Sequence, residues 1–180
     1  MIPPSGAWWT YCGIKSYAVV GTDMICISTE CNGTYCLDTA SNAWSQVGKW
    51  KLPFYGKAEY APELKLWFGL SVQVGNLVAV DLSGIDSSQP QLVGEWENEF
   101  DPPEEWLQHD DSQLVNLGSG RFCIVRFFKT QIGTYKGCYG HEPIYHYFVV
   151  FTGVEVMPVA HGVGSSDSRR YDAVRELNSE

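Results

Sequence analysis

Short apolar runs alternate with clusters of turn residues along most of this chain. Residues 16–21 (SYAVVG) and 24–29 (MICIST) alternate apolar and polar positions around a short turn, which predicts a hairpin. Asn32-Gly33 marks the next turn, because Asn-Gly readily adopts the positive φ angles of two-residue hairpin turns. Two further strands are expected at 34–37 and 43–47.

The same pattern continues to residue 157. Its apolar positions are rich in β-branched and aromatic residues, which favours strands over helices. Residues 129–145 are rich in Gly and Tyr, and we expect them to form a long loop or a sheet edge. The Gly118-Ser119-Gly120 triplet predicts the tight turn of a late hairpin. The expected strands lie at 57–61, 66–71, 76–82, 91–96, 113–117, 121–128, 147–151 and 154–157.

One arrangement occurs twice: a strand, an Asp, a polar turn, a return strand and a Trp. Asp38 is followed by Trp44, and Asp81 is followed, after a longer loop, by Trp96. In such turns the Asp carboxylate accepts backbone N–H bonds from residues two positions on. The Trp then adds a large apolar side chain to the sheet that the hairpin joins.

These elements predict an all-β fold. About a dozen short strands, grouped in fours at roughly 45-residue spacing, are typical of a β-propeller. We therefore predict a partial, propeller-like fold of about three to four antiparallel blades, with a β-sandwich as the alternative. The β domain is expected to cover residues 1–157. Residues 158–180 are expected to form a Gly/Ser-rich, charged tail with a strand remnant at 168–171 and a frayed or short helical end at 172–177.

Charge and composition restrict the expected partners and the expected cellular location of the protein. The 180 residues are 44% hydrophobic and carry a net charge of −9, which favours a folded protein and argues against nucleic-acid or membrane partners. No apolar run approaches the roughly 20 residues that span a bilayer. The first residues lack the basic and apolar regions of a signal peptide. We expect a cytoplasmic or nuclear protein whose six cysteines are reduced thiols.

Several strings in the sequence resemble known proteins. Leu37-Asp38 with Trp44 is similar to the end of a kelch-type blade, although the Gly-Gly doublet of that repeat is missing. A wider resemblance, over nearly the whole chain, is to a grass-expanded family of plant proteins described as a domain of unknown function and often as kelch-like or F-box-associated. It implies a propeller-like fold without an established activity, and a match to the C-terminal half of longer members. The strings that carry it lie at 25–29, 33–35, 38–40, 48–54, 58–63, 66–69, 117–123 and 151–156.

Motifs for catalysis, cofactors and metals are absent from the sequence. It contains no nucleophile elbow, zinc-protease helix, phosphate loop or dinucleotide fingerprint. Cys26, Cys31 and Cys36 are spaced five apart, unlike the close ligand pairs of zinc sites. The four histidines are scattered, and Ser119 belongs to a hairpin turn. We therefore expect no catalytic residue, no cofactor and no metal.

An acidic stretch followed by a Tyr-rich segment is the most unusual surface feature. Residues 97–111 hold seven acidic residues and no Lys or Arg. The simpler interpretation is a solvated loop, and the functional one is a docking loop for a basic protein with Trp106 as its apolar anchor. The candidate protein-binding residues are Glu97, Glu99, Asp101, Glu104, Glu105, Trp106, Asp110, Asp111, Tyr135, Tyr139 and Tyr145.

The predicted function is that of a non-enzymatic protein-binding module, a substrate-recognition or scaffold segment of a kelch-like protein. Its expected partner is a protein of basic character, with no nucleic acid and no membrane. Self-association through open blade edges is also expected, as for a truncated relative with unpaired blades. The alternative is an enzyme-like propeller with an axial polar site. Its residues would be Glu59, His141, Asp38 and Arg121.

Overall fold

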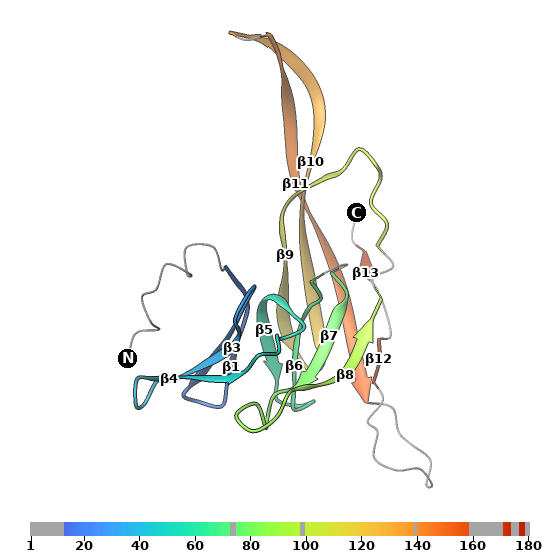
Figure 1. Cartoon of the computed structure of the whole chain (residues 1–180). Coiled ribbons are helices and arrows are strands. Elements are labelled where there is room, and N and C mark those ends of the chain that lie inside the picture. The colour runs from blue at the N-terminus through green and yellow to red at the C-terminus, as the bar shows by residue number, and fades with distance from the viewer. Residues whose placement is uncertain are drawn as a thin grey trace.

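The computed structural model describes residues 13–72, 75–97, 100–138 and 140–158, together with the backbone of 171–173 and 177–178. All regular structure in these residues is β-strand (Figure 1). The strands are β1 (Ile14–Val20), β2 (Met24–Thr29), β3 (Gly33–Asp38), β4 (Ala43–Gly48), β5 (Tyr55–Ala61), β6 (Leu66–Leu70), β7 (Leu77–Asp81), β8 (Gln91–Trp96), β9 (Leu107–Gly118), β10 (Arg121–Gly137), β11 (Gly140–Pro158), β12 (Tyr171–Ala173) and β13 (Leu177–Asn178).

The strands form three consecutive antiparallel groups, which we call sheet 1 (β1–β4), sheet 2 (β5–β8) and sheet 3 (β9–β12, with β13 beside β11). Sheets 1 and 2 are joined into one eight-stranded mixed sheet, because β1 pairs in parallel with β5 through residues 16–18 and 56–58. The groups follow one another in Figure 1 from blue through green to orange. The all-β prediction is confirmed. Neither a closed barrel nor a closed ring is formed by the described strands.

One apolar core lies between sheets 1 and 2, and a second lies between sheets 2 and 3. Sheet 2 therefore contributes side chains to both cores. In β6, Phe68 and its neighbours at alternate positions face sheet 3, whereas Trp67 faces the core shared with sheet 1. In β7, Val78 and Val80 face sheet 1, and Leu77 and Ala79 face sheet 3. A strand buried on both faces reads as a continuous apolar run, which is why these two strands stand out in the sequence.

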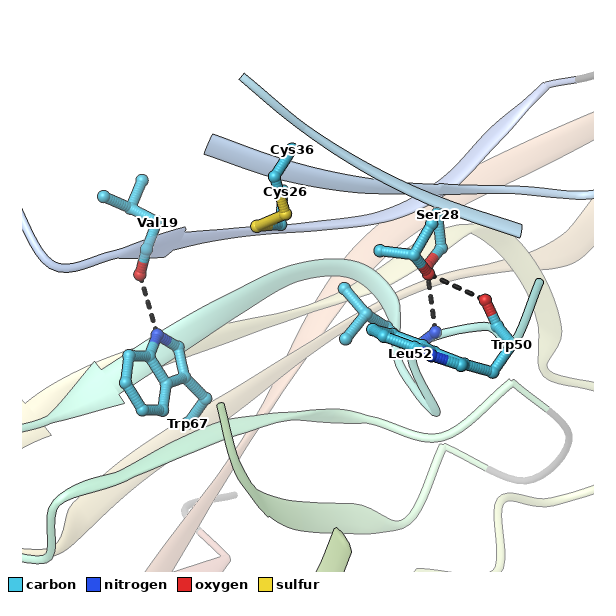
Figure 2. The surroundings of a disulfide bond; sticks show 8 residues. Val19, Cys26, Ser28, Cys36, Trp50, Leu52 and Trp67 are labelled. Carbon is cyan, nitrogen blue, oxygen red and sulfur yellow. Dashed lines mark hydrogen bonds between the residues drawn. A yellow bond between two sulfur atoms is a disulfide. The ribbon is translucent and has the colours of Figure 1, made fainter. Parts of the chain in front are cut away.

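Sheet 1 is tied to sheet 2 by polar contacts as well as by packing (Figure 2). The indole N–H of Trp67 donates to the Val19 carbonyl oxygen at 2.7 Å, which links β6 to β1. The Leu52 N–H donates to the buried Ser28 hydroxyl at 2.9 Å. The Thr34 hydroxyl donates to the Trp50 carbonyl at 2.8 Å. The segment that leaves sheet 1 is therefore held against its inner face before β5 begins.

Both predicted Asp turns are confirmed. Asp38 Oδ1 accepts the N–H of Ala40 at 2.8 Å, and Asp81 Oδ1 accepts the N–H of Ser83 at 2.9 Å. The Ser41 hydroxyl also donates to Asp38 Oδ2 at 2.7 Å. Asn42 then adopts a φ of 52°, a left-handed conformation that Asn tolerates better than most residues. These local bonds set the connection from β3 to β4 without help from the core.

Acidification should weaken the β3–β4 turn through Asp38. Hydrogen bonds from the Ser41 hydroxyl and the Ser41 and Ala40 N–H groups lower the pKa of this carboxyl from 3.8. A carboxyl with a lowered folded-state pKa contributes stability above its unfolded pKa, and this contribution is lost as the pH falls through the folded value. We expect wild type to lose more stability between pH 5 and pH 3 than Asp38→Asn, which keeps an acceptor but does not titrate. Urea denaturation at both pH values measures the difference, and equal losses would contradict the assignment.

Four expectations for the later chain and the cysteines are wrong. The described residues within 129–145 form no long loop, because β10 pairs with β11 there, whereas the alternative of a sheet edge fits, because β9 pairs with β10 only as far as Lys129. The strands expected at 147–151 and 154–157 are one strand, β11. The helix expected at 172–177 is replaced by strand pairing at both of its described ends, in β12 and β13. Cys26 and Cys36 form a disulfide, and Cys31 is also disulfide-bonded, so these three are not free thiols.

Candidate functional site

The hairpin formed by β10 and β11 of sheet 3 projects well beyond the other strands and is the most prominent surface feature (Figure 1). Its strands pair from Arg121 opposite Glu155 to Gly137 opposite Gly140, with one register shift between Gln131 and Gly133. Strand β9 accompanies β10 only as far as Leu107, which pairs with Lys129. Beyond that point the hairpin has two strands, and we call residues 130–146 the arm.

The described part of the arm exposes apolar and aromatic side chains to solvent. Ile132 is 64% exposed, Tyr135 50% and Ile144 40%. The Tyr135 hydroxyl donates to Glu142 across the two strands, and this bond raises the pKa of the phenol. The Lys129 ammonium lies 4.8 Å from the centre of the Tyr145 ring. An isolated two-stranded hairpin is marginally stable in water, so cross-strand contacts of this kind support the arm.

The acidic stretch lies next to the base of the arm. Residues 97–106 connect β8 to β9, and 107–111 begin β9 itself. The side chains of Glu97, Asp101, Glu104 and Glu105 are exposed on the connection, as are Asp110 and Asp111 on the strand. Glu99 and Tyr139 lie outside the described residues. The structure therefore brings the described acidic candidates to one end of sheet 3.

Trp106, the expected apolar anchor for a partner, makes aromatic contacts within the chain. Its ring is half-buried and contacts two aromatic rings, Phe148 at 4.7 Å and Phe128 at 5.7 Å between centres. His109 meets Tyr147 edge-on at 4.8 Å nearby. Trp106 therefore fastens the acidic connection to the root of the arm. The apolar run at 147–151 was the available signal for this cluster, but it does not show which rings meet.

A pocket of about 480 Å³ opens beside this cluster, between sheet 2 and sheet 3. Tyr55 donates its hydroxyl to Asp111 Oδ2 at 2.9 Å, which raises the pKa of the phenol. Arg126 is buried in the wall, where Nη1 donates to Thr152 Oγ1 at 2.5 Å and the guanidinium lies 4.7 Å from the Phe100 ring centre. The described lining contains no His or Cys to serve as a base or thiol nucleophile. Of these residues, only Asp111 was a sequence candidate.

The residues of the predicted axial polar site do not come together. Arg121 begins β10 opposite Glu155, whereas His141 pairs with Lys136 near the far end of the arm. The two positions are separated by roughly 50 Å of extended strand. Asp38 lies in the β3–β4 turn of sheet 1. These residues do not form one site, so the prediction that they converge on an axial polar site is wrong.

Metal-ligating groups do not cluster in the described part of the chain: no three His, Cys, Asp or Glu residues there are placed to hold one ion. Cys123 is a half-buried free thiol whose pKa is raised by burial, and Cys138 is an exposed one. Within the described ranges no helix is long and apolar enough to cross a membrane.

These features define a layered all-β protein whose third sheet carries a projecting aromatic arm with an acidic segment at its base. The chain belongs to the family described as protein of unknown function (DUF1668), whose family model matches residues 3–177. This confirms the predicted membership in a domain family of unknown function. Neither a curated protein nor a solved structure matches the chain.

Proposed function

We propose that the protein is a non-enzymatic protein-binding module that recognises its partner with the arm and the adjacent acidic segment. The observation that carries the proposal is the exposure of Ile132, Tyr135 and Ile144 on a hairpin that projects from the packed body. Tyr and β-branched side chains bury large area at low entropic cost, which suits a binding surface. The arm also offers backbone groups on both outer strand edges to an extended peptide.

The partner is a protein with a basic surface. The acidic segment contributes several exposed carboxylates beside the arm, and the whole chain carries a net charge of −9. Such a field attracts basic proteins during encounter and repels nucleic acids and anionic membranes. Association should therefore be faster at low ionic strength than at high ionic strength.

The scaffold is a partial propeller, and sheets 1, 2 and 3 are its blades. Three successive antiparallel groups, two of four strands and one of five, pack face to face through two cores and support this arrangement. The first strands of sheets 1 and 2 lie side by side in parallel, as the inner strands of neighbouring blades do. A kelch-like, F-box-associated plant protein that selects substrates in the cytoplasm or nucleus is the specific form of the proposal.

Photo-cross-linking from the arm tests the function. A benzophenone amino acid replaces Ile132 to capture the partner in a cell extract, and the same group at Leu92, which is 55% exposed on β8, is the matched control. With the captured partner purified, we expect Ile132→Ser combined with Tyr135→Ser to weaken binding at least 10-fold, because two apolar contacts are lost. Titration calorimetry at two salt concentrations measures both affinity and charge dependence.

Leu92→Ser should bind the purified partner as tightly as wild type. Unfolding measurements on each variant verify that the body is intact, since exposed substitutions usually change stability by less than about 0.5 kcal/mol. Unchanged affinity of the arm variant for a partner that cross-links at Ile132 would contradict the proposal.

A further inference from the structure

The outer face of sheet 3 carries a cluster of apolar side chains, with the exposed Gln113 and Asp110 of β9 beside it. In β10, alternate residues such as Phe122 and Ile124 are buried against sheet 2, so the residues between them face away from the core. Register places Val125 beside Phe151 and Phe127 beside Val149 on this outward face. The Phe151 side chain is 51% exposed. The outward apolar set is Val115, Val125, Phe127, Val149 and Phe151.

The outer face of sheet 1, at the opposite end of the stack, has the same character. Ala18, Cys26 and Cys36 lie in the core shared with sheet 2, so their sequence neighbours point outward. Tyr17 is 42% exposed and Val19 50% exposed. On this face Tyr17 pairs with Ile27, and Val19, Ile25 and Leu37 form a cross-strand row.

From these two faces we infer that the protein associates with a second copy of itself, the outer face of sheet 3 of each copy packing on the outer face of sheet 1 of the other. The inference rests on the blade arrangement of the proposed scaffold. Within one chain, each core already forms by packing the apolar face of one group on that of the next. Two copies supply six groups, a number within the usual range of closed propellers, which have typically about 4–8 blades.

The area is sufficient for a stable pair. A face of four strands with about five residues each measures roughly 17 by 19 Å, or about 300 Å². Two interfaces cover four such faces, so roughly 1,300 Å² of sheet leaves the solvent, against the roughly 1,200–2,000 Å² of stable interfaces. A symmetric pair also closes on itself, because each copy uses both of its end faces and leaves none for a third.

Light scattering coupled to size exclusion tests the inference with single-face variants. Wild type should have twice the mass of the 20.1 kDa chain. Phe151→Glu and Tyr17→Glu should each be monomeric, because either charge would be buried in both interfaces of the pair. An equimolar mixture of the two variants should regain dimer at tens of micromolar, because in a mixed pair both charges meet in one interface and the other is wild type.

Leu92→Glu, on an exposed position of β8 away from both end faces, is the control and should remain a dimer. Circular dichroism and thermal unfolding show that each variant is folded, so loss of mass reports on the interface. A monomeric wild type would overturn the inference and leave the end faces to another protein or another segment. Dimers of Tyr17→Glu alone, or mixtures that stay monomeric, would overturn it as well. Partner binding by the arm is measured separately with the Ile132 and Tyr135 variants. The dimer inference and the proposed binding function can therefore fail independently.

Discussion

Replacing Phe68 by alanine is expected to lower the free energy of unfolding by about 3–5 kcal/mol, the usual range for a buried Phe→Ala substitution. Phe68 is fully buried in β6 and lies 4.5 Å from Phe122 of sheet 3, between ring centres. The Trp96 ring of β8 stacks with Phe68 at 6.1 Å between ring centres. The substitution would leave a cavity where sheets 2 and 3 meet. Urea denaturation followed by circular dichroism measures the change.

Leu92→Ala serves as the control for Phe68→Ala, because this side chain is largely exposed in the same sheet. Its effect should stay within about 0.5 kcal/mol. A loss of less than about 1.5 kcal/mol for Phe68→Ala would mean that sheets 2 and 3 do not share the described core.

Reduction of the Cys26–Cys36 disulfide is expected to destabilise the protein by roughly 2–3 kcal/mol. The two residues lie directly opposite each other in β2 and β3, ten positions apart in sequence, and both are buried in the core between sheets 1 and 2 (Figure 2). In the chain-entropy account, the closed loop removes disorder from the unfolded state, and opening the bond restores it. Denaturation with and without dithiothreitol measures the loss.

The double variant Cys26→Ala with Cys36→Ala separates this bond from Cys31, which is also disulfide-bonded. Its stability should be lower than that of oxidised wild type, and it should lose less on addition of reductant. Equal responses of the two proteins to dithiothreitol would contradict a stabilising role for the Cys26–Cys36 bond.

The disulfide also provides a test of cellular location. Disulfides persist mainly in oxidising compartments and are rare in the cytosol and nucleus. The cytoplasmic or nuclear location stays a prediction, and the state of these two cysteines in the cell can test it. Alkylation of free thiols in intact cells, followed by mass spectrometry of the peptides that carry Cys26 and Cys36, reports their state. Fully alkylated cysteines agree with the prediction, and a protected pair places the protein in an oxidising compartment.

Much of the strand pattern could be predicted because it depends on local rules. The alternation of 24–29, the continuous apolar run of 66–70 and the turns at Asp38 and Asp81 each specify structure through neighbours in sequence. Strand β8 begins and ends where it was expected, at 91–96. The sequence strings that carry the family resemblance could likewise be identified from the sequence alone.

The arm could not be predicted in this way, because its residues bury little. Glycines and polar side chains at 129–145 give no apolar alternation, and the strands are held by backbone pairing that continues outward from β10 and β11. The aromatic cluster of Trp106 and the pocket around Arg126 required distant segments to meet. Trp106 is 22 positions from Phe128 and 42 from Phe148, and the pocket joins Tyr55 to Asp111 and Arg126, so no local pattern encodes these contacts.

By itself, the sequence determined the all-β character, the hairpin turns and the family of this protein, since strand propensity and turn chemistry act over a few residues. Only the tertiary structure decided that three antiparallel groups of strands pack through two cores, that Cys26 and Cys36 are bonded, and that apolar side chains stay exposed on the outer faces of sheets 1 and 3. These features depend on strand register and on which faces meet. A shift of one residue in register would turn every buried side chain of a strand outward, so they are properties of the assembled sheets.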